Sequence, residues 1–206
     1  MSSTKAGFIA VVGRPNVGKS SLLNHLVGEK IALVSHKANA TRKRLNIIVM
    51  FEDAQMIFVD TPGIHHQEKL LNKFMLEEAI KAIGDSDLSI FLADATDQLK
   101  YYEEFLELNK NKPHILVLTK TDKLSKGELL KKIDAYSVYQ DRYANLVPIS
   151  IKKGEGEDEL LKTIKELLPE SPYFYDPEIM TTEQIKDIYK EMIRESIFEN
   201  LSEEIP

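Results

Sequence analysis

The chain has 206 residues, of which 43% are hydrophobic and 29% are charged. These values are typical of one large globular domain, or of one domain followed by part of another, and they exclude disordered, fibrous and membrane-spanning chains. Asp and Glu outnumber Lys and Arg by 33 to 27, so a generally basic surface cannot be the basis of nucleic-acid binding. The absence of cysteine excludes disulfides and thiolate metal sites and favours a reducing compartment.

Short apolar segments alternate with helical patterns over the first 170 residues. The predicted strands cover residues 8–12, 45–52, 55–59, 88–93, 114–119 and 146–149. The predicted helices cover residues 19–27, 69–83, 101–109, 126–139 and 157–168. Strands rich in Val, Ile and Leu that are interleaved with helices predict an α/β fold with helices on both faces of a mostly parallel, six-stranded sheet. A hairpin between the second and third strands supplies one antiparallel edge strand.

The composition changes after Leu168, where prolines punctuate a short aromatic stretch, Tyr173–Tyr175. This segment is typical of a linker that is held in place by its rings. Beyond it, apolar residues recur at helical spacing from Ile185 to Leu201 and predict a helix with one face to bury. The expected organisation is a first domain over residues 1–170, a linker over 171–181, and the start of an incomplete second domain over 182–206.

A phosphate-binding motif, G-x-x-x-x-G-K-[ST], lies between the first predicted strand and the first predicted helix. Its members are Gly13, Arg14, Pro15, Asn16, Val17, Gly18, Lys19 and Ser20, and Ser21 follows them in the helix. Glycines let backbone N–H groups surround phosphate oxygens, Lys19 supplies positive charge to the β- and γ-phosphates, and the Ser20 hydroxyl is a Mg²⁺ ligand. The strand–loop–helix context argues against a chance glycine-rich turn, so the motif predicts nucleoside triphosphate binding.

Three further motifs each follow a predicted strand. The first consists of Asp60, Thr61, Pro62 and Gly63. Here a carboxylate can reach the Mg²⁺ shell and a glycine N–H can sense the γ-phosphate, although a plain turn would explain the motif if it stood alone. The second consists of Thr119, Lys120, Thr121 and Asp122, and the third of Ser150, Ile151 and Lys152.

The second and third motifs predict which base is bound. The Asp122 carboxylate can accept hydrogen bonds from guanine N1–H and N2–H₂ together, a donor pair that adenine lacks. The third motif places a backbone N–H near guanine O6. Each of these motifs is weak evidence alone, but four motifs in this order, each at the carboxyl end of a predicted strand, indicate a guanine-nucleotide site.

Together these motifs resemble those of the Era family of bacterial ribosome-assembly GTPases, translation-factor-class P-loop GTPases of the TrmE-Era-EngA type. The resemblance rests on residues 13–20, 37–42, 60–65, 119–122, 150–154, 173–177 and 191–195. It implies a P-loop GTPase fold and Mg²⁺-dependent hydrolysis of GTP to GDP, with Thr41 as the switch threonine that closes over the metal and the γ-phosphate. The implied metal ligands are Ser20, Thr41 and Asp60, and the implied catalytic residues are Lys19, Thr41, Gly63 and Asn16.

The resemblance also implies partners. Residues 182–206 would begin an RNA-binding KH domain whose G-x-x-G clamp loop is missing from the chain. The implied role is a molecular switch in small (30S) ribosomal subunit assembly and 16S rRNA maturation, in the cytoplasm, with peripheral association with the inner membrane left open and no stable oligomer expected. Two alternatives remain: a GTP-binding module with negligible turnover, and a P-loop kinase of a small molecule.

Two departures from the usual GTPase pattern bear on these expectations. Thr119 stands where Asn is usual, so it can brace the loop but loses an amide contact to guanine N7, at a cost of about 1 kcal/mol. Ile64 stands where Ras-type GTPases carry the glutamine that orients water. Related GTPases with an Asn in the phosphate loop use a bound K⁺, so the resemblance makes Asn16 a candidate ligand for K⁺, which would neutralise charge between the β- and γ-phosphates. The alternative is that Asn16 only stabilises the loop. A general-base role for His65 or His66 is the less favoured interpretation.

Overall fold

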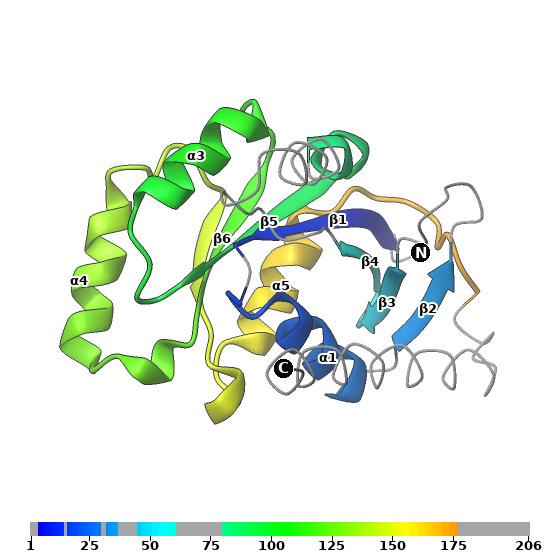
Figure 1. The fold of residues 1–206 in the computed structure, drawn as a ribbon. Coiled ribbons are helices and arrows are strands. Elements are labelled where there is room, and N and C mark those ends of the chain that lie inside the picture. Colours follow the sequence, from blue (N-terminus) through cyan, green and yellow to red (C-terminus); the bar gives the residue numbers. More distant parts are fainter. Residues whose placement is uncertain (1–3, 15, 30–31, 37–44, 61–79, 177–206) are drawn as a thin grey trace, which may run out of the picture.

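The computed structural model describes residues 4–14, 16–29, 32–36, 45–60 and 80–176, and its core is a single sheet of seven strands (Figure 1). The strands are β1 Lys5–Gly13, β2 Ala32–His36, β3 Leu45–Phe51, β4 Ala54–Asp60, β5 Leu88–Asp94, β6 His114–Thr119 and β7 Asn145–Pro148. Their order across the sheet is β2-β3-β4-β1-β5-β6-β7. Six of them run in one direction, because only β3 pairs antiparallel with both of its neighbours.

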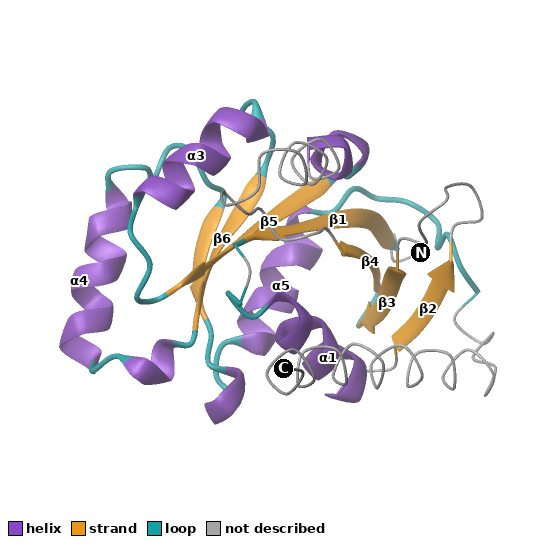
Figure 2. Cartoon of the chain, in the orientation of Figure 1, coloured by secondary structure: helices purple, strands orange, loops and turns teal. Residues whose placement is uncertain are grey.

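Helices cover both faces of the sheet (Figure 2). The helices are α1 Lys19–Glu29, α3 Lys100–Asn109, α4 Lys126–Ser137 and α5 Glu157–Leu167, with short 3₁₀ turns η1 Thr121–Lys123 and η2 Ile151–Lys153. Residues 80–85 are also helical and are the described end of the helix predicted at 69–83. Successive side chains of β1 alternate between the two faces, as strand geometry requires: Ile9 packs into the core under α1 and α5, and Ala10 into the core under α3 and α4.

The predicted α/β architecture is confirmed, but the predicted sheet lacked one strand. The missing strand is β2, at residues 32–36, which pairs with β3 as the edge of the sheet. The single antiparallel strand is therefore β3, one position in from the edge where it was expected. The sequence signal for β2 is weak because the apolar run has only four residues, Ile31 to Val34, and is followed by Ser35 and His36.

The segment after α5 returns along the amino ends of β1 and β4. The Ser171 N–H donates to the Thr4 carbonyl at 3.0 Å, and the Phe174 ring lies 5.3 Å from the Phe8 ring. The buried Gln55 amide accepts from the N–H groups of Phe174 and Tyr175 at 2.8 and 3.0 Å and donates to the Tyr175 carbonyl at 2.7 Å. Residues 171–176 are thus fixed by an amide as well as by rings, while the rest of the predicted linker and the predicted helix lie outside the described residues.

Helices of the described ranges are all too short or too polar to cross a lipid bilayer.

Candidate nucleotide-binding site

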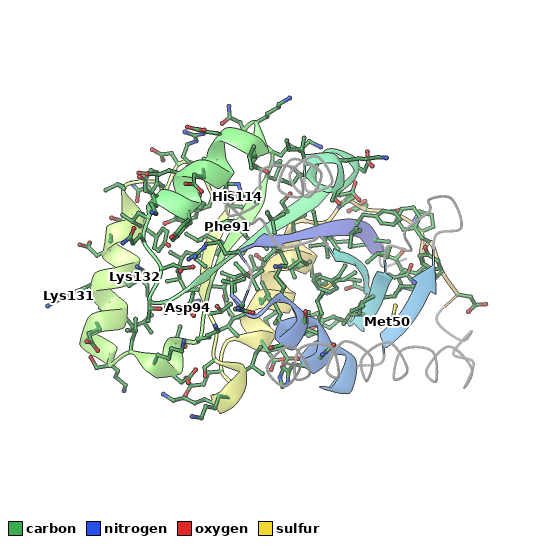
Figure 3. All side chains as sticks on the ribbon, in the orientation of Figure 1. Met50, Phe91, Asp94, His114, Lys131 and Lys132 are labelled. Atoms are coloured by element: carbon green, nitrogen blue, oxygen red, sulfur yellow. The ribbon has the colours of Figure 1, made fainter. Side chains whose placement is uncertain are left out.

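The predicted motifs lie at the carboxyl edge of the sheet. Strands β4, β1, β5 and β6 are adjacent and parallel, and they end at Asp60, Gly13, Asp94 and Thr119. Their register places Asp94 opposite Thr119 and Gly13 opposite Leu92, so the loops that follow these strands emerge side by side. Figure 3 labels Asp94 at this edge. Because these loops project from one edge, the fold brings together motifs that are more than 100 residues apart in sequence.

The phosphate loop, residues 13–20, has a backbone that demands glycine at two positions. A Cβ at Gly13 would lie 2.8 Å from the Leu92 carbonyl oxygen and 2.9 Å from the Val17 side chain, so the strand end is packed too tightly for any other residue. Gly18 has φ +104°, which L side chains rarely adopt. Asn16 has φ +59°, in the left-handed region that Asn tolerates better than most residues. The backbone of the phosphate loop thus runs into the start of α1 with few side chains around it. An anion-binding loop needs this arrangement, because backbone N–H groups at a helix start bind the anion.

Lys19 supplies the positive charge of the phosphate loop. Its Nζ donates to the Gly13 and Arg14 carbonyl oxygens, both at 3.2 Å, so the ammonium lies over the loop that it follows in sequence. The first turn of α1 contains no acidic residue that would compete for that charge. Bonds of an ammonium to phosphate oxygens are shorter and stronger than these long bonds to carbonyls, so the arrangement suits a phosphate chain.

Thr119 braces the phosphate loop, as expected for a threonine in place of the usual asparagine. Its hydroxyl donates to the Val17 carbonyl at 2.6 Å and lies 3.3 Å from the Ala93 carbonyl, in a buried position. The end of β6 is thus hydrogen-bonded directly to the phosphate loop. The predicted cost of losing the N7 contact remains a prediction.

Lys120 follows with φ +56° and joins the same loop through its ammonium. Its Nζ donates to the Asn16 carbonyl oxygen and pairs with Asp94 Oδ2 at 2.9 Å, and Lys123 Nζ lies 3.3 Å from the same oxygen. Burial alone would raise the pKa of Asp94, but hydrogen bonds from the N–H and hydroxyl of Thr96 and the Lys120 ammonium outweigh it and hold that pKa far below its usual range. Asp94 is therefore a permanent anion between the two lysines.

The two base motifs contact each other. The hydroxyl of Ser150, which is fully buried, donates to Asp122 Oδ1 at 2.9 Å and accepts from the Lys153 N–H at 3.2 Å. Ser150 therefore caps η2, which contains Ile151 and Lys152, while it orients the carboxylate predicted to read guanine. The sequence predicted a backbone contact for the Ser150 motif and missed this side-chain role.

Gly156 closes the same loop. It has φ +88°, and a Cβ there would lie 2.2 Å from the Pro148 carbonyl oxygen. The backbone of Ser150 pairs with that of Glu155 in both directions at 3.0 Å. Because no L side chain fits at position 156, this glycine allows the loop of residues 150–156 to fold back against the end of β7.

Asp97 is a second site residue that the sequence did not single out. Its Oδ1 accepts from Arg14 Nη1 at 2.8 Å, and its Oδ2 accepts from the Asp94 N–H at 3.2 Å. The Arg14 guanidinium also lies 3.8 Å from the centre of the Tyr101 ring, a cation–π contact that fixes its direction. The only signal for Asp97 in the sequence is its position in the polar segment D-A-T-D directly after a buried strand.

Three further histidines, His25, His36 and His114, have no acidic or cysteine companions at metal-ligand spacing in the sequence. His114 is buried, with Nε2 2.8 Å from the Tyr102 hydroxyl and Nδ1 3.1 Å from the Asn109 amide, and burial lowers its pKa. His25 Nε2 lies 2.7 Å from Glu157 Oε2 and links α1 to α5. His36 lies in β2. Both described contacts are structural, and no group of three or more metal-binding side chains occurs within the described ranges.

Several predicted site residues lie outside the described residues. These are Pro15, Thr41, Thr61, Pro62 and Gly63, with Ile64, His65 and His66 next to them. Of the predicted Mg²⁺ ligands, Ser20 lies in the first turn of α1 and the backbone of Asp60 ends β4. The described part of the site therefore comprises the phosphate loop, apart from Pro15, and both base motifs.

Comparisons with known proteins agree with this geometry. Residues 8–120 match the family model described as 50S ribosome-binding GTPase. The chain is 50% identical over 202 residues to GTPase Era of Campylobacter hominis, covering 98% of this chain and 70% of that protein. A crystal structure of an Aquifex aeolicus Era variant bound to GDP and AlF₄⁻ superposes with a TM-score of 0.72 at 38% identity, over 86% of this chain and 62% of that one. Era in complex with MgGDPNP and nucleotides 1506–1542 of 16S ribosomal RNA gives a TM-score of 0.72 at 38% identity, over 85% and 61%.

Proposed function

The chain belongs to the Era family of GTPases, and from this premise we propose that the described loops bind guanine nucleotide and that the chain hydrolyses GTP as a molecular switch. One observation carries the proposal: the phosphate loop is joined to the base motif through Thr119 and Lys120, so the two halves of a nucleotide site form one unit. A small-molecule kinase has no need of a carboxylate held for guanine.

The phosphate loop fits a Mg²⁺-bound triphosphate. Gly13 and Gly18 keep its backbone clear of side chains, and Lys19 already lies over the loop. We assign Ser20, Thr41 and Asp60 as the Mg²⁺ ligands, and a bound Mg²⁺ supplies neutralisation of charge on the β- and γ-phosphate oxygens. The ammonium of Lys19 and the backbone donors at the start of α1 stabilise the same charge as it develops.

The base motifs fit guanine. Asp122 Oδ1 is occupied by the Ser150 hydroxyl, which fixes the plane of the carboxylate and leaves Oδ2 for the base. We assign Asp122 as the acceptor of guanine N1–H and N2–H₂, and the backbone of Ile151 or Lys152 as the donor to O6. Thr119 contributes the brace of the phosphate loop and no base contact.

Hydrolysis requires alignment of a water molecule, which Ile64 cannot provide. We propose K⁺ at Asn16 as the additional cation, because the Asn16 side chain is exposed while its backbone is fixed by the Lys120 ammonium. The alternative is that Asn16 is needed only because it tolerates the left-handed backbone conformation at this position. It predicts equal GTP turnover rates with different monovalent cations. Thr41 and Gly63 would hold the switch segments while the γ-phosphate is present and release them after hydrolysis.

The biological role we propose is assembly of the small ribosomal subunit with maturation of 16S rRNA, supported by the family and by the Era complex with a 16S rRNA fragment. Residues 1–170 form the GTPase domain in this proposal, 171–181 the linker, and 182–206 the start of a KH domain that contacts RNA. The proposed location is the cytoplasm, with peripheral inner-membrane association as a further possibility to test and no stable oligomer. The 206-residue chain is expected to bind RNA poorly.

Base selectivity tests the proposed site directly. Asp122→Asn replaces an acceptor by a donor, so it should weaken GTP binding and shift preference toward xanthosine triphosphate, whose base presents a carbonyl where guanine presents N2–H₂. Competition binding with GTP, ATP and xanthosine triphosphate measures this shift. Asp134→Asn, on the exposed side of α4, is the matched control and should leave all three affinities unchanged. Equal affinities for the three nucleotides in the unchanged chain would disprove the proposal.

A further inference from the structure

Two ammonium groups flank the carboxylate that is assigned to guanine. Lys120, Asp122 and Lys123 lie within four residues, on and beside the η1 turn. Long lysine side chains this close in sequence can reach Asp122, and an Asp122 paired to a lysine would have to give up that partner before it could accept from a base. Neither lysine forms an ion pair with Asp122 in the described part of the chain.

Both lysines are instead held by Asp94, at the end of β5. Asp94 Oδ2 lies 2.9 Å from Lys120 Nζ and 3.3 Å from Lys123 Nζ. The other oxygen, Oδ1, accepts from the Thr96 N–H at 3.0 Å and the Thr96 hydroxyl at 2.8 Å, so the carboxylate cannot turn away from the lysines without losing both bonds. The Asp94 side chain is 12% exposed, whereas the side chains of Lys120 and Lys123 are 32% and 48% exposed, so solvent and salt reach the pairs mainly from the lysine side.

The position of Asp94 is itself fixed from the neighbouring loop. Its backbone N–H donates to Asp97, whose other oxygen holds Arg14 of the phosphate loop. The carboxylate is therefore supported by the sheet, by Thr96 and by Asp97, and it stays ionised because its pKa lies far below the usual range. A fixed anion of this kind can act as a permanent counter-ion for mobile lysine side chains.

We propose that Asp94 is a positioning residue for guanine selectivity, which holds the ammonium groups of Lys120 and Lys123 on its own Oδ2 and thereby keeps Asp122 Oδ2 available to the base. The inference rests on the proposed role of Asp122. It assigns Asp94 no contact with the nucleotide. The effect of Asp94 on guanine selectivity depends instead on the flanking lysines, above all on Lys123, because Lys120 is also held by the phosphate loop.

Asp94→Asn tests this assignment. An Asn side chain can still accept from Thr96 but presents an amide donor, or a neutral oxygen, to the lysines. The released lysines should then pair with Asp122, so GDP should bind about tenfold more weakly, equivalent to one charged hydrogen bond. Discrimination between GDP and IDP should fall by a similar factor, because IDP lacks the N2 amino group that Asp122 reads. Titration calorimetry with both nucleotides in the full chain measures the two effects.

Removal of Lys123 distinguishes positioning from a purely structural role. Lys123→Met alone should change GDP affinity and the GDP-to-IDP affinity ratio little. In the double variant Asp94→Asn/Lys123→Met, the loss of Lys123 should restore at least part of the affinity ratio that Asp94→Asn loses. Asp134→Asn is the control for loss of an aspartate elsewhere on the surface. If Asp94→Asn does not fold, Asp94→Glu is the second variant. Because glutamate keeps the charge that holds the lysines, the GDP-to-IDP affinity ratio should stay within about threefold of that of the unchanged chain.

Each outcome has a definite meaning. Unchanged discrimination in Asp94→Asn, a loss that Lys123→Met does not relieve, or a collapse of discrimination in Asp94→Glu would each overturn the proposed role of Asp94. The Asp122→Asn variant separates this failure from failure of the proposed site. If Asp122→Asn gains xanthosine nucleotide while Asp94→Asn behaves as the unchanged chain, only the role of Asp94 is wrong.

Discussion

The phosphate loop and the base motifs lie at the same edge of the sheet but are held in place by different means. The phosphate loop is shaped mainly by its own residues, namely two glycines, a helix start, and a lysine bonded to carbonyls five and six residues away, and it is braced from outside by Thr119 and Lys120. The base motifs depend on side chains from distant parts of the chain, with Ser150 bonded to Asp122 across 28 residues and Lys120 paired with Asp94 across 26. The phosphate loop is thus encoded locally in sequence and then braced by residues after β6, whereas the base motifs take shape only once the sheet has formed.

The largest effect should come from the phosphate loop. Lys19→Ala removes the ammonium that we assign to the β- and γ-phosphates, so GTP affinity should fall about a thousandfold, the equivalent of two charged hydrogen bonds. Fluorescent-nucleotide titration measures this loss, and circular dichroism should show an unchanged fold because the site is local. Lys131→Ala is the matched control, since Lys131 projects from α4 away from the site (Figure 3). Retained affinity in Lys19→Ala would contradict the assignment.

An intermediate effect should come from the loop that carries Ser150. Gly156→Ala places a methyl group 2.2 Å from a carbonyl oxygen and at φ +88°, so the free energy of unfolding should fall by about 3 kcal/mol. Urea unfolding monitored by circular dichroism gives this value, and guanine-nucleotide affinity should fall with it.

The same change at Gly127 is the control for this prediction. A Cβ at Gly127 meets nothing within 4 Å, and the residue lies in α4, so Gly127→Ala should be neutral or should stabilise the chain by about 0.5–1 kcal/mol. Equal effects of the two substitutions would show that residues 150–156 do not depend on the close packing at Gly156.

The smallest effect concerns Asn16, where the two regions meet. If its side chain binds K⁺, GTP turnover should be about tenfold faster in KCl than in NaCl at equal ionic strength, and Asn16→Ala should abolish the difference. Phosphate release measured in both salts decides between the two roles of this residue. Equal rates in the unchanged chain would leave Asn16 with its backbone role alone.

The difference between the two regions also explains how far the sequence alone could go. The phosphate loop is a contiguous motif, so its members and its place between a strand and a helix were predictable from periodicity and spacing. Asp122 was found in the same way because it follows a buried strand. The positions of these motifs on one edge of the sheet then followed from the parallel topology.

Other features depend on tertiary contacts that leave no local pattern. Asp94 and Asp97 belong to a polar turn of ordinary composition, and only the register of β5 with β6 brings Asp94 to Lys120. Gln55 looks like any polar residue at the start of a strand, yet it is fully buried against residues 174 and 175. Strand β2 was missed because a five-residue edge strand offers too little periodicity to recognise.

The anchoring of residues 171–175 near the amino ends of β1 and β4 places this segment toward the edge of the sheet opposite the nucleotide site. Gln55, which holds residues 174 and 175, lies opposite Ala6 of β1, and the seven residues from there to Gly13 span roughly 23 Å at the usual rise of about 3.3 Å per residue. Because β1 is hydrogen-bonded to a strand on each side, its length is fixed while the sheet is folded. A binding partner that contacts both the bound nucleotide and residues 171–175 therefore needs two separate contact surfaces, toward opposite edges of the sheet.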